Sequence, residues 1–478
     1  MRIDLMRACF LVTLRKGALS HRPPLNKASP KSAVKNPVRH PRGHLQAALI
    51  APSRHGLSEK SISPGARTVV STLQQSGYQA ELVGGCVRDL LLGQRPKDFD
   101  VVTDALPDEV RRVFRRARLI GRRFRLAHVR VGREVIEVST YRAKPDSEEN
   151  DDSVLNEHGR ILRDNVFGTR EEDVLRRDLT VNALYYDPGS NTIFDYVGGF
   201  DDIHERRLRF IGDPQERLNE DPVRMLRAVR FKTKLNLAFA KGIEGLIAQN
   251  AYLLRHVPPA RLFDEVLKMF HHGYALNLFN LLRHLGMFAE LFPEAERTFT
   301  DTDLAPDTGL VCRVLKNTDQ RVQQGKPVIA AFLFAGLLWR AVCLERERRM
   351  GHGVASYPAL QQAAVAVIGR ESQRISIPRR VSSIVYEIWE LQGRLESRRP
   401  RTIHRLLENK RFRAAYDFLV LRSGAGEVPE SLAEWWTQIQ EHSVPQQQEM
   451  IKALNSGPAR NKRRRPRKRS NEQSKQGT

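Results

Sequence analysis

The 478-residue sequence lacks the patterns that mark disulfide-stapled, zinc-binding and membrane-spanning proteins. Its four cysteines are scattered and form no C-x-x-C pair, which argues against structural zinc and fits a reducing compartment. No apolar run approaches the length needed to cross a bilayer, so we expect a soluble protein without a membrane-spanning segment. An adjacent His-Asp pair is also missing, so no metal phosphohydrolase of that type is fused to the chain. The length suits several domains with a sizeable core.

Acidic residues are scarce at both ends of the chain, whose formal net charge is +24. Residues 1–60 hold 12 Lys and Arg against 2 Asp and Glu, and residues 457–478 hold 9 against 1. Such segments usually bind a polyanion by releasing its counterions, which makes binding salt-sensitive and indifferent to sequence. A merely solubilising role is the alternative. It is weaker for KRRRPRKR at 462–469, because seven cations in eight residues repel one another.

The rest of the chain is organised around residues 82–104, LVGGCVRDLLLGQRPKDFDVVTD. An apolar strand end leads into Gly84 and Gly85, and apolar residues at helical spacing follow, with Arg88 on another face. Two residues without Cβ atoms let backbone N–H groups approach an anion closely, and the start of a helix adds its positive end. The pattern therefore predicts a strand, a glycine turn and a helix that together bind phosphate.

Two carboxylates follow this turn, Asp98 and Asp100, separated by Phe99. Side chains alternate across a strand, so we expect both carboxylates on one face and the phenyl ring in the core. Paired carboxylates at this spacing can bridge two divalent cations about 3.5–4 Å apart, which clamp the oxygens of a phosphoryl displacement. Alone, D-x-D is more often a solvated strand edge or a turn. Directly after a phosphate-binding turn, it favours metal binding.

Two further strands are expected at 119–131 and 134–142, as a hairpin around Gly132. Glu137 lies between apolar residues in EVIEVST, so we expect its strand to be buried and its charge to need a partner. A metal ion shared with the D-x-D pair would serve, and an arginine would serve equally well.

The segment DVLRRDLTVNALYYD (173–187) alternates apolar residues from Leu179 as a strand does, or begins a buried helix. Within it, Asp178 can pair with one of the two preceding arginines. In NEDPVRMLRAVRF (219–231), Pro222 suits the first position of a helix and Asp221 its N-cap.

Arg224 and Arg227 are three residues apart, so they lie on or near the face that carries Asp221. Helices are also expected at 66–75 and 107–115, and helical periodicity continues from about residue 240 to residue 456.

Taken in order, these motifs resemble those of the class II tRNA nucleotidyltransferase and bacterial poly(A) polymerase family. The matches are GG, RD and DxD within 84–100, RRD and Asn within 176–182, DYVGG at 195–199, and the segments 219–231 and 258–270. The pattern LIGRRF with a following His (119–128) is similar to bacterial poly(A) polymerases rather than to their CCA-adding relatives. Its Arg122 and Arg123 would hold triphosphate or RNA, or are solvated strand residues.

The resemblance implies an α+β fold, in which a small mixed-sheet nucleotidyltransferase head precedes an all-α neck, body and tail. The expected divisions are a disordered basic segment 1–62, the catalytic head 63–199, the neck 200–275, the body 276–456 and a disordered basic tail 457–478. The neck would select the nucleotide and bind RNA, and the body would bind RNA. DYVGG would act as the hinge between head and neck.

The resemblance also implies template-independent addition of AMP from ATP to RNA 3′ ends with release of pyrophosphate. Asp98 and Asp100 would hold two Mg²⁺ ions, and Asp178 would be the third carboxylate of the site. Asp221 and Arg224 would select adenine by pairing with its edge, although an Asp that also caps a helix has only part of its acceptor capacity free. Gly84, Gly85, Arg88 and Asn182 would bind the nucleotide, and the tail would bind RNA through Arg463, Arg464, Arg465, Arg467, Lys468 and Arg469.

The main alternative is addition of CCA to tRNA from CTP and ATP on the same type of head. A second alternative is an RNA-binding protein whose head is catalytically inactive. We expect a monomer of the bacterial cytoplasm that marks RNA for decay and contacts the RNA-decay machinery. The basic, acid-poor beginning would also fit a mitochondrial transit peptide.

Overall fold

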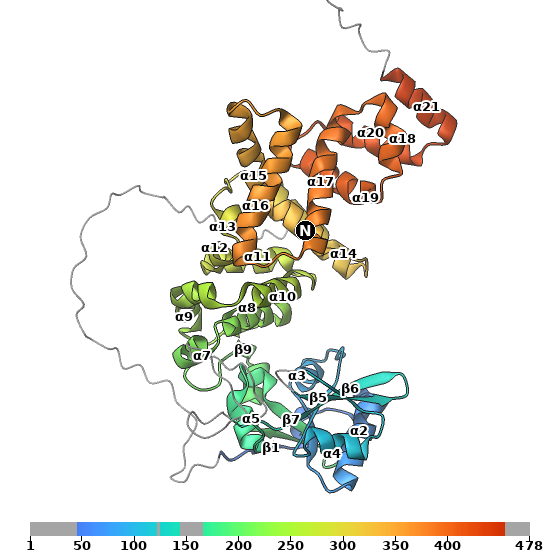
Figure 1. Ribbon diagram of the computed structural model, residues 1–478. Coiled ribbons are helices and arrows are strands. Elements are labelled where there is room, and N and C mark those ends of the chain that lie inside the picture. Colours follow the sequence, from blue (N-terminus) through green and yellow to red (C-terminus); the bar gives the residue numbers. More distant parts are fainter. Residues whose placement is uncertain (1–44, 122–124, 144–165, 455–478) are drawn as a thin grey trace, which may run out of the picture. The chain divides into compact units, whose positions relative to one another are not determined.

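The computed structural model describes residues 45–121, 125–143 and 166–454. A mixed sheet comes first along the chain and helices follow, which confirms the predicted α+β class (Figure 1). In the described residues, eight strands form this sheet in the order β1-β8-β7-β2-β3-β6-β5-β4. They are β1 (Ala48–Ile50), β2 (Ala80–Val83), β3 (Asp100–Thr103), β4 (Arg118–Ile120), β5 (Leu126–Val131), β6 (Glu134–Thr140), β7 (Leu184–Asp187) and β8 (Thr192–Asp195).

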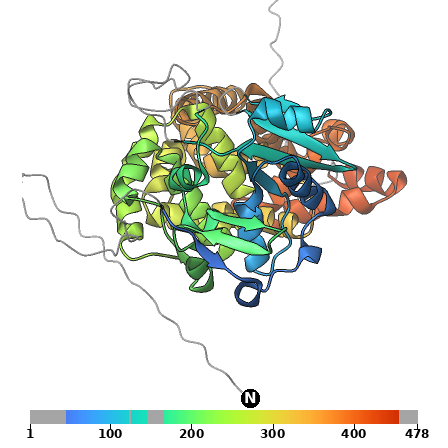
Figure 2. The same cartoon turned by 90° about the horizontal axis from the view of Figure 1, so that it is seen from below.

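Strand β2 lies between β7 and β3, and all four of its residues are buried. Strands β3 and β6 run parallel, whereas the other neighbours in this sheet are antiparallel. The parallel register places Asp100 beside Glu137. Figure 2 shows the strands of this sheet side by side, coloured from blue to green. Asp100, which follows the glycine turn, thus lies near the centre of the sheet.

The helices of the sheet-forming part are α1 to α6. Helix α2 begins two residues before the expected start, after Ser63, whose hydroxyl accepts a hydrogen bond from the Ala66 N–H, and Pro64 occupies the first turn. Its apolar face is buried against β2, β3, β5 and β6. The predicted helices at 66–75 and 107–115 are confirmed. The bounds are α1 (Pro52–His55), α2 (Pro64–Gln75), α3 (Gly85–Leu91), α4 (Pro107–Val113), α5 (Arg170–Arg176) and α6 (Gly199–His204).

The predicted hairpin around Gly132 is confirmed, because β5 and β6 pair antiparallel and Gly132 adopts φ +58°. The single strand expected over 119–131 is wrong in detail. The run divides into β4 and β5, which pair with each other antiparallel, and Gly121 after β4 adopts φ +88°. A glycine in the left-handed region ends a strand readily. Residues 122–124, including Arg122 and Arg123, lie outside the described residues.

The segment from Leu179, in which apolar residues alternate, forms neither a strand nor an α-helix. Residues Thr180–Asn182 form a 3₁₀ turn, and strand β7 begins only at Leu184. The backbone before the turn is fixed from outside, since Leu179 forms an isolated β-bridge with Phe210. The apolar residues alternate here because each of their side chains is buried, and not because the backbone is a regular strand.

The DYVGG segment forms a tight turn that starts α6. One oxygen of Asp195 accepts hydrogen bonds from the N–H groups of Val197, Gly198 and Gly199 at 2.9–3.1 Å, and the other oxygen accepts from Phe200 at 2.9 Å. Gly198 adopts φ +77°, and a Cβ atom on Gly199 would lie 2.2 Å from the Thr180 carbonyl oxygen. Both glycines are therefore required by the turn itself, and the hinge role stays a prediction.

The remainder of the described chain is helical, apart from the short parallel pair β9 (Arg207–Leu208) and β10 (Ala238–Phe239), so the predicted helical pattern is confirmed. None of its helices is long and apolar enough to cross a membrane. The helices are α7 (Pro214–Glu220), α8 (Val223–Leu235), α9 (Ile243–Asn250), α10 (Pro259–Phe270), α11 (Ala275–His284), α12 (Met287–Leu291), α13 (Pro293–Glu296), α14 (Leu310–Gln323), α15 (Ala330–Gly351), α16 (Ser356–Arg374), α17 (Arg379–Ser397), α18 (Ile403–Leu407), α19 (Phe412–Gly424), α20 (Glu430–Glu441) and α21 (Val444–Ala453).

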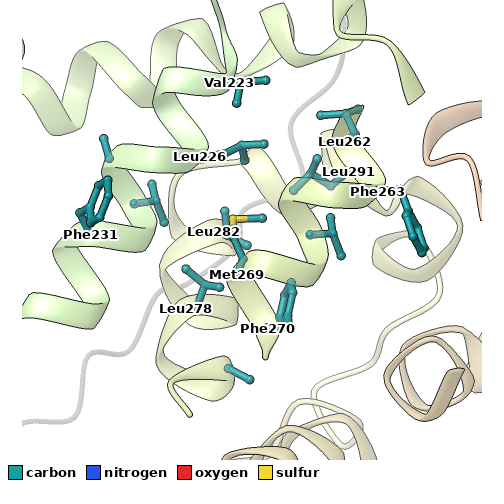
Figure 3. Packing of buried hydrophobic residues seen from close by; sticks show 14 of the residues in the cluster. Val223, Leu226, Phe231, Leu262, Phe263, Met269, Phe270, Leu278, Leu282 and Leu291 are labelled. Carbon is teal, nitrogen blue, oxygen red and sulfur yellow. The ribbon is translucent and has the colours of Figure 1, made fainter. Parts of the chain in front are cut away.

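Helix α8 packs its apolar face against α10 and α11. Figure 3 shows Leu226 of α8, Met269 of α10 and Leu282 of α11 in one cluster. Buried side chains continue in this cluster from Ile50 to Phe418, and a second cluster lies among the helices from α17 onward. Because one core crosses the expected boundaries at 199/200 and 275/276, those divisions stay an interpretation of the sequence.

Candidate active site

The glycine turn has the predicted strand-turn-helix structure. Gly84 follows β2 with φ +76° and ψ −126°, a conformation essentially restricted to glycine, and Gly85 begins α3. The Gly84 N–H donates to the Leu184 carbonyl at 3.4 Å. A Cβ atom on Gly84 would lie 3.4 Å from a guanidinium nitrogen of Arg177, so this arginine lies directly at the turn.

Asp98 and Asp100 lie at the start of β3, but only Asp100 belongs to the strand. Asp98 is in the bend before it, 76% exposed, with the Lys97 ammonium 3.9 Å away. The pKa of Asp100 is raised to about 6, mainly by burial and next by the nearby Glu137, while Arg177 opposes both effects. Asp98 also raises the pKa of Asp100 by repulsion. A divalent cation would relieve this excess of negative charge.

Glu137 was expected to be buried, and this expectation is wrong. Its side chain is 51% exposed, because Ile136 and Val138 turn inward and leave Glu137 on the open face of β6. Among the described side chains its partner is His128 on β5, whose Nε2 lies 3.2 Å from Oε1, and not an arginine. The same face brings Glu137 beside Asp100 in the parallel register.

Asp178 is buried and fully engaged. It accepts hydrogen bonds from the Leu179 N–H at 2.8 Å, from the Asn182 amide at 3.4 Å and from the Arg227 guanidinium. Burial opposes ionisation, but the Arg227 charge and these hydrogen bonds outweigh it and hold the pKa of Asp178 below its ordinary value. The pairing partner is thus Arg227 from α8, and not one of the two preceding arginines.

Asn182 connects Asp178 to Arg88. The buried guanidinium of Arg88 donates to the Asn182 amide oxygen and, through Nε at 2.8 Å and Nη2 at 2.6 Å, to Asp89. The ring of Phe231 on α8 lies under the same guanidinium, with 4.9 Å from Cζ to the ring centroid. Arg227 Cζ lies 6.0 Å from that ring. Contacts therefore close a circuit, which we call the five-residue circuit, through Arg88, Asn182, Asp178, Arg227 and Phe231.

The two residues expected to select the base do not pair with each other. Asp221 receives two hydrogen bonds from Arg261 of α10, at 2.9 and 2.6 Å, and one from the Val223 N–H at 3.2 Å. Arg224 donates at 2.7 Å to Glu220 and at 2.8 Å to the Arg217 carbonyl. The helix starts one residue later than expected, with Pro222 at the N-cap, while Asp221 still accepts from its first turn.

Sequence reasoning missed Arg177 and Arg261 as members of the site. Arg177 donates hydrogen bonds to Asp173 at 2.8 Å and to the Tyr185 hydroxyl at 2.9 Å. Its guanidinium lies beside Gly84, and its charge lowers the pKa of Asp100. It belongs to the RRD motif, and Arg261 belongs to the segment 258–270. The sequence thus offered one clue to each arginine: it lies inside a segment that matches the family. No role had been assigned to either residue.

The residues present fit a magnesium site built on two carboxylates. Within the described ranges, no group of three or more His, Cys, Asp and Glu side chains is arranged to hold a metal ion. Mg²⁺ usually needs only one or two carboxylates, since water and substrate phosphates supply its other ligands. Asp98 and Asp100 are sufficient in number for that requirement, while both oxygens of Asp178 already accept hydrogen bonds from Leu179, Asn182 and Arg227. The tail cations Arg463 to Arg469 lie outside the described residues.

Comparison with known proteins places the chain in a family. A family model described as "Poly A polymerase head domain" matches residues 80–209, "Probable RNA and SrmB- binding site of polymerase A" matches 236–299, and "Polymerase A arginine-rich C-terminus" matches 352–470. Poly(A) polymerase I of Salmonella typhi is 44% identical over 88% of this chain and 92% of that protein.

CCA-adding enzymes are more distant. The enzyme of Geobacillus stearothermophilus is 36% identical over 47% of this chain and 53% of that protein. A crystal structure of the Bacillus stearothermophilus CCA-adding enzyme in complex with CTP superposes with a TM-score of 0.54 at 25% identity, covering 83% of this chain and 89% of that one. The predicted grouping with poly(A) polymerases rather than with CCA-adding enzymes is therefore confirmed, and the chain belongs to the poly(A) polymerase family of nucleotidyltransferases.

Proposed function

We propose that this chain adds AMP from ATP to the 3′ hydroxyl of RNA without a template and releases pyrophosphate. The observation that carries the proposal is that the carboxylate of Asp100 lies beside Glu137 in the sheet. The guanidinium of Arg177 lies at the glycine turn and also lowers the pKa of Asp100. In this arrangement the two carboxylates would serve cations, and the backbone of the turn with Arg177 would serve phosphates. The relative that matches over nearly the whole chain is a poly(A) polymerase I.

Asp98 and Asp100 would hold two Mg²⁺ ions, which supply charge neutralisation of the triphosphate and a lower pKa of the attacking hydroxyl when bound. Asp100 must lose its proton to act as a ligand, and its pKa of about 6 permits this at neutral pH. For the third carboxylate we favour Glu137 by its position beside Asp100, and we assign Asp178 a supporting role through Arg227.

The phosphates of ATP would lie at the glycine turn. The Gly84 N–H is used by the Leu184 carbonyl, so Gly84 would contribute the absence of a side chain and Gly85 the backbone N–H at the start of α3. Arg177 adds a charge held in place by Asp173 and Tyr185. Three hydrogen bonds to Asn182 and Asp89 fix the guanidinium of Arg88, which would contribute charge and rigidity to the turn. Asn182 orients both Arg88 and Asp178.

Adenine would be selected by Asp221 and Arg224 at the start of α8. A carboxylate offers about four acceptor positions. Three hydrogen bonds from Arg261 and Val223 orient Asp221 and leave capacity for the exocyclic amine of adenine. Arg224 uses one nitrogen for Glu220 and the Arg217 carbonyl, and its other donors can reach a ring nitrogen.

The decisive experiment is extension of two RNAs, a generic oligonucleotide and a tRNA without its CCA end, with Mg²⁺ and each nucleoside triphosphate separately. Long tails from ATP alone on the generic RNA are expected. Addition that stops after two C and one A on the tRNA would instead show CCA addition. Binding of RNA without extension would favour the inactive RNA-binding alternative. Replacement of Asp98 by Ala is expected to abolish extension and to retain RNA binding.

Binding of RNA by the basic end Arg463 to Arg469 is part of the same proposal. Removal of residues 457–478 should weaken RNA binding and reduce its salt dependence, because fewer counterions are released. An unchanged slope would contradict a role for this segment. A monomer in the bacterial cytoplasm that works with the RNA-decay machinery stays a prediction from the sequence.

A further inference from the structure

A cavity of about 170 Å³ lies among the helices that follow the sheet. It shares no lining residue with the candidate active site. The end of α10, helices α14, α15 and α19, and the segment before α15 contribute to it. Its apolar walls are formed by Pro327, Val328, Ile329, Phe332, Leu333 and Ala414. An apolar cavity with a few fixed polar groups is the usual form of a small-ligand site.

His271 supplies one of these polar groups. Its Nε2 is buried and has no hydrogen-bond partner in the described part of the chain. Burial and the neighbouring His272 lower the pKa of His271, so its ring is neutral at physiological pH. A neutral imidazole offers either an N–H donor or a nitrogen acceptor at Nε2. Unpartnered buried polar atoms are uncommon in proteins, and a turn of the ring that opens Nε2 toward the cavity would let it bond a polar atom of a ligand there.

Asp417 supplies a carboxylate on another wall. Its Oδ1 lies 3.0 Å from Nε of Arg413, and its Oδ2 lies 3.9 Å from Nη1 of Arg321. Both arginines pair with the carboxylate. The Arg413 side chain is 72% exposed, whereas Arg321 is partly buried and also donates to the Pro327 carbonyl. The cavity thus has an apolar interior and two polar groups. His271 can donate or accept a hydrogen bond, Asp417 can accept one, and the two arginines make the rim cationic.

This combination fits one nucleobase of a single-stranded RNA. A base is flat and apolar on its faces, carries donors and acceptors on its edge, and is flanked by phosphates on both sides. The cationic rim favours a polyanion over an apolar protein segment. The two matched segments also meet here, since His271 lies within the RNA-binding match 236–299, and Ala414 and Asp417 lie within the arginine-rich match 352–470.

We propose that the cavity takes one base of bound RNA, with the base edge against His271 and Asp417 and the adjacent phosphates against Arg321 and Arg413. The base would lie behind the 3′ end and would anchor the RNA to the helical part of the chain during successive additions. The proposal rests on RNA being the substrate, as in the proposed function.

The test is equilibrium binding of single-stranded oligo(A) RNA to the full chain without ATP, by fluorescence anisotropy. Ala414→Phe fills the cavity and removes no charge. It should weaken binding about tenfold, the effect of losing one stacked base, and leave the slope of log affinity against log salt unchanged. The same RNA with abasic residues should bind both proteins equally. Val420→Phe, on the exposed side of the same helix, is the matched control and should bind like the wild type.

Equal affinity of Ala414→Phe and wild type for oligo(A) would overturn the proposal. A loss accompanied by a reduced salt slope would also overturn it, because phosphate contacts and not a base would then have been removed. Arg413→Gln should reduce that slope and serves as the positive control. His271→Ala gives an independent reading if Ala414→Phe does not fold. AMP addition at saturating RNA separates the two proposals, since its absence in the wild type would count against the proposed function and not against the cavity.

Discussion

The guanidinium of Arg227 on α8 donates through Nε to Oδ2 of Asp178, so a buried carboxylate of the sheet-forming part is neutralised by a helix that follows it in sequence. Asp178 is 9% exposed, and its other oxygen is occupied by Leu179 and Asn182. This ion pair belongs to the five-residue circuit. The residue that resemblance places at the catalytic centre is thus also the residue that joins two parts of the chain.

Replacement of Arg227 by Leu should therefore destabilise the protein, because it leaves the Asp178 charge buried without its cation. We expect a loss of about 3 kcal/mol in the free energy of unfolding, at the low end for such pairs because the Arg227 side chain is 38% exposed. Urea denaturation measures this. The double variant Asp178→Asn with Arg227→Leu should recover part of the loss, and strictly additive effects would show that the pair is not coupled.

The lowered pKa of Asp178 also predicts a pH dependence. A carboxyl group whose pKa is lower in the folded state stabilises the fold above its unfolded pKa of about 3.9, and this contribution is lost as the pH falls through the folded value. The wild type should therefore lose this stability in acid below about pH 4. The variant Asp178→Asn should not show that component.

Replacement of Asp100 by Asn should abolish AMP addition and yet stabilise the protein. The pKa of Asp100 is raised to about 6, so its ionised form at pH 7 is unfavourable in the fold, and removal of the charge should contribute about 1–3 kcal/mol. Between about pH 4 and 6 the folded state binds the extra proton, so wild-type stability falls as the pH rises through this window.

Asp98→Asn is the matched control for Asp100→Asn. The Asp98 side chain is 76% exposed, so its stability should change by no more than about 0.5 kcal/mol, while activity is lost in the same way. Thermal unfolding at pH 5 and pH 7 distinguishes the two variants. Equal stability of both at pH 7 would contradict the buried charge at Asp100.

Gly84→Ala should destabilise the glycine turn by about 2 kcal/mol, since φ +76° with ψ −126° is strained for any residue with a Cβ atom. It should also raise the KM for ATP, because the methyl group would lie where we propose that the phosphates bind. Gly369→Ala in α16 is the control. That glycine is exposed, has no atom within 4 Å of an added Cβ, and should gain up to about 1 kcal/mol from helix propensity. Denaturant midpoints and ATP kinetics give both readings.

Arg261→Gln should relax the choice of nucleotide. Arg261 orients Asp221 with two hydrogen bonds, and loss of this orientation should reduce the preference for ATP over CTP by about tenfold, with a smaller change in kcat. Arg255→Gln removes a similar two-bond pair with Glu290 on the surface and should leave nucleotide preference unchanged. An unaltered ATP to CTP ratio in Arg261→Gln would argue against Asp221 as a base-selecting residue.

The sequence predicted the local elements of the site well and the long-range partners poorly. Glycine spacing and apolar periodicity were sufficient for the turn at Gly84, the hairpin at Gly132 and the helical part, because these depend on neighbours in the chain. The partners of Asp178 and Asp221 lie about 40–50 residues away, and each arginine in the chain was an equal candidate before the fold was known. Glu137 was misplaced because apolar neighbours in a strand bury only their own face.

The order of strands in the sheet also sets when the catalytic part can form during synthesis. The central strand β2 ends at Val83, but its neighbour β7 and the strand β8 beyond it are complete only at Asp195. A ribosome adding about 5–20 residues per second needs roughly 6–22 seconds for that interval. The strand that carries the glycine turn therefore waits with one edge unpaired until the later strands emerge. Chaperone occupancy of the nascent chain should be highest over this interval.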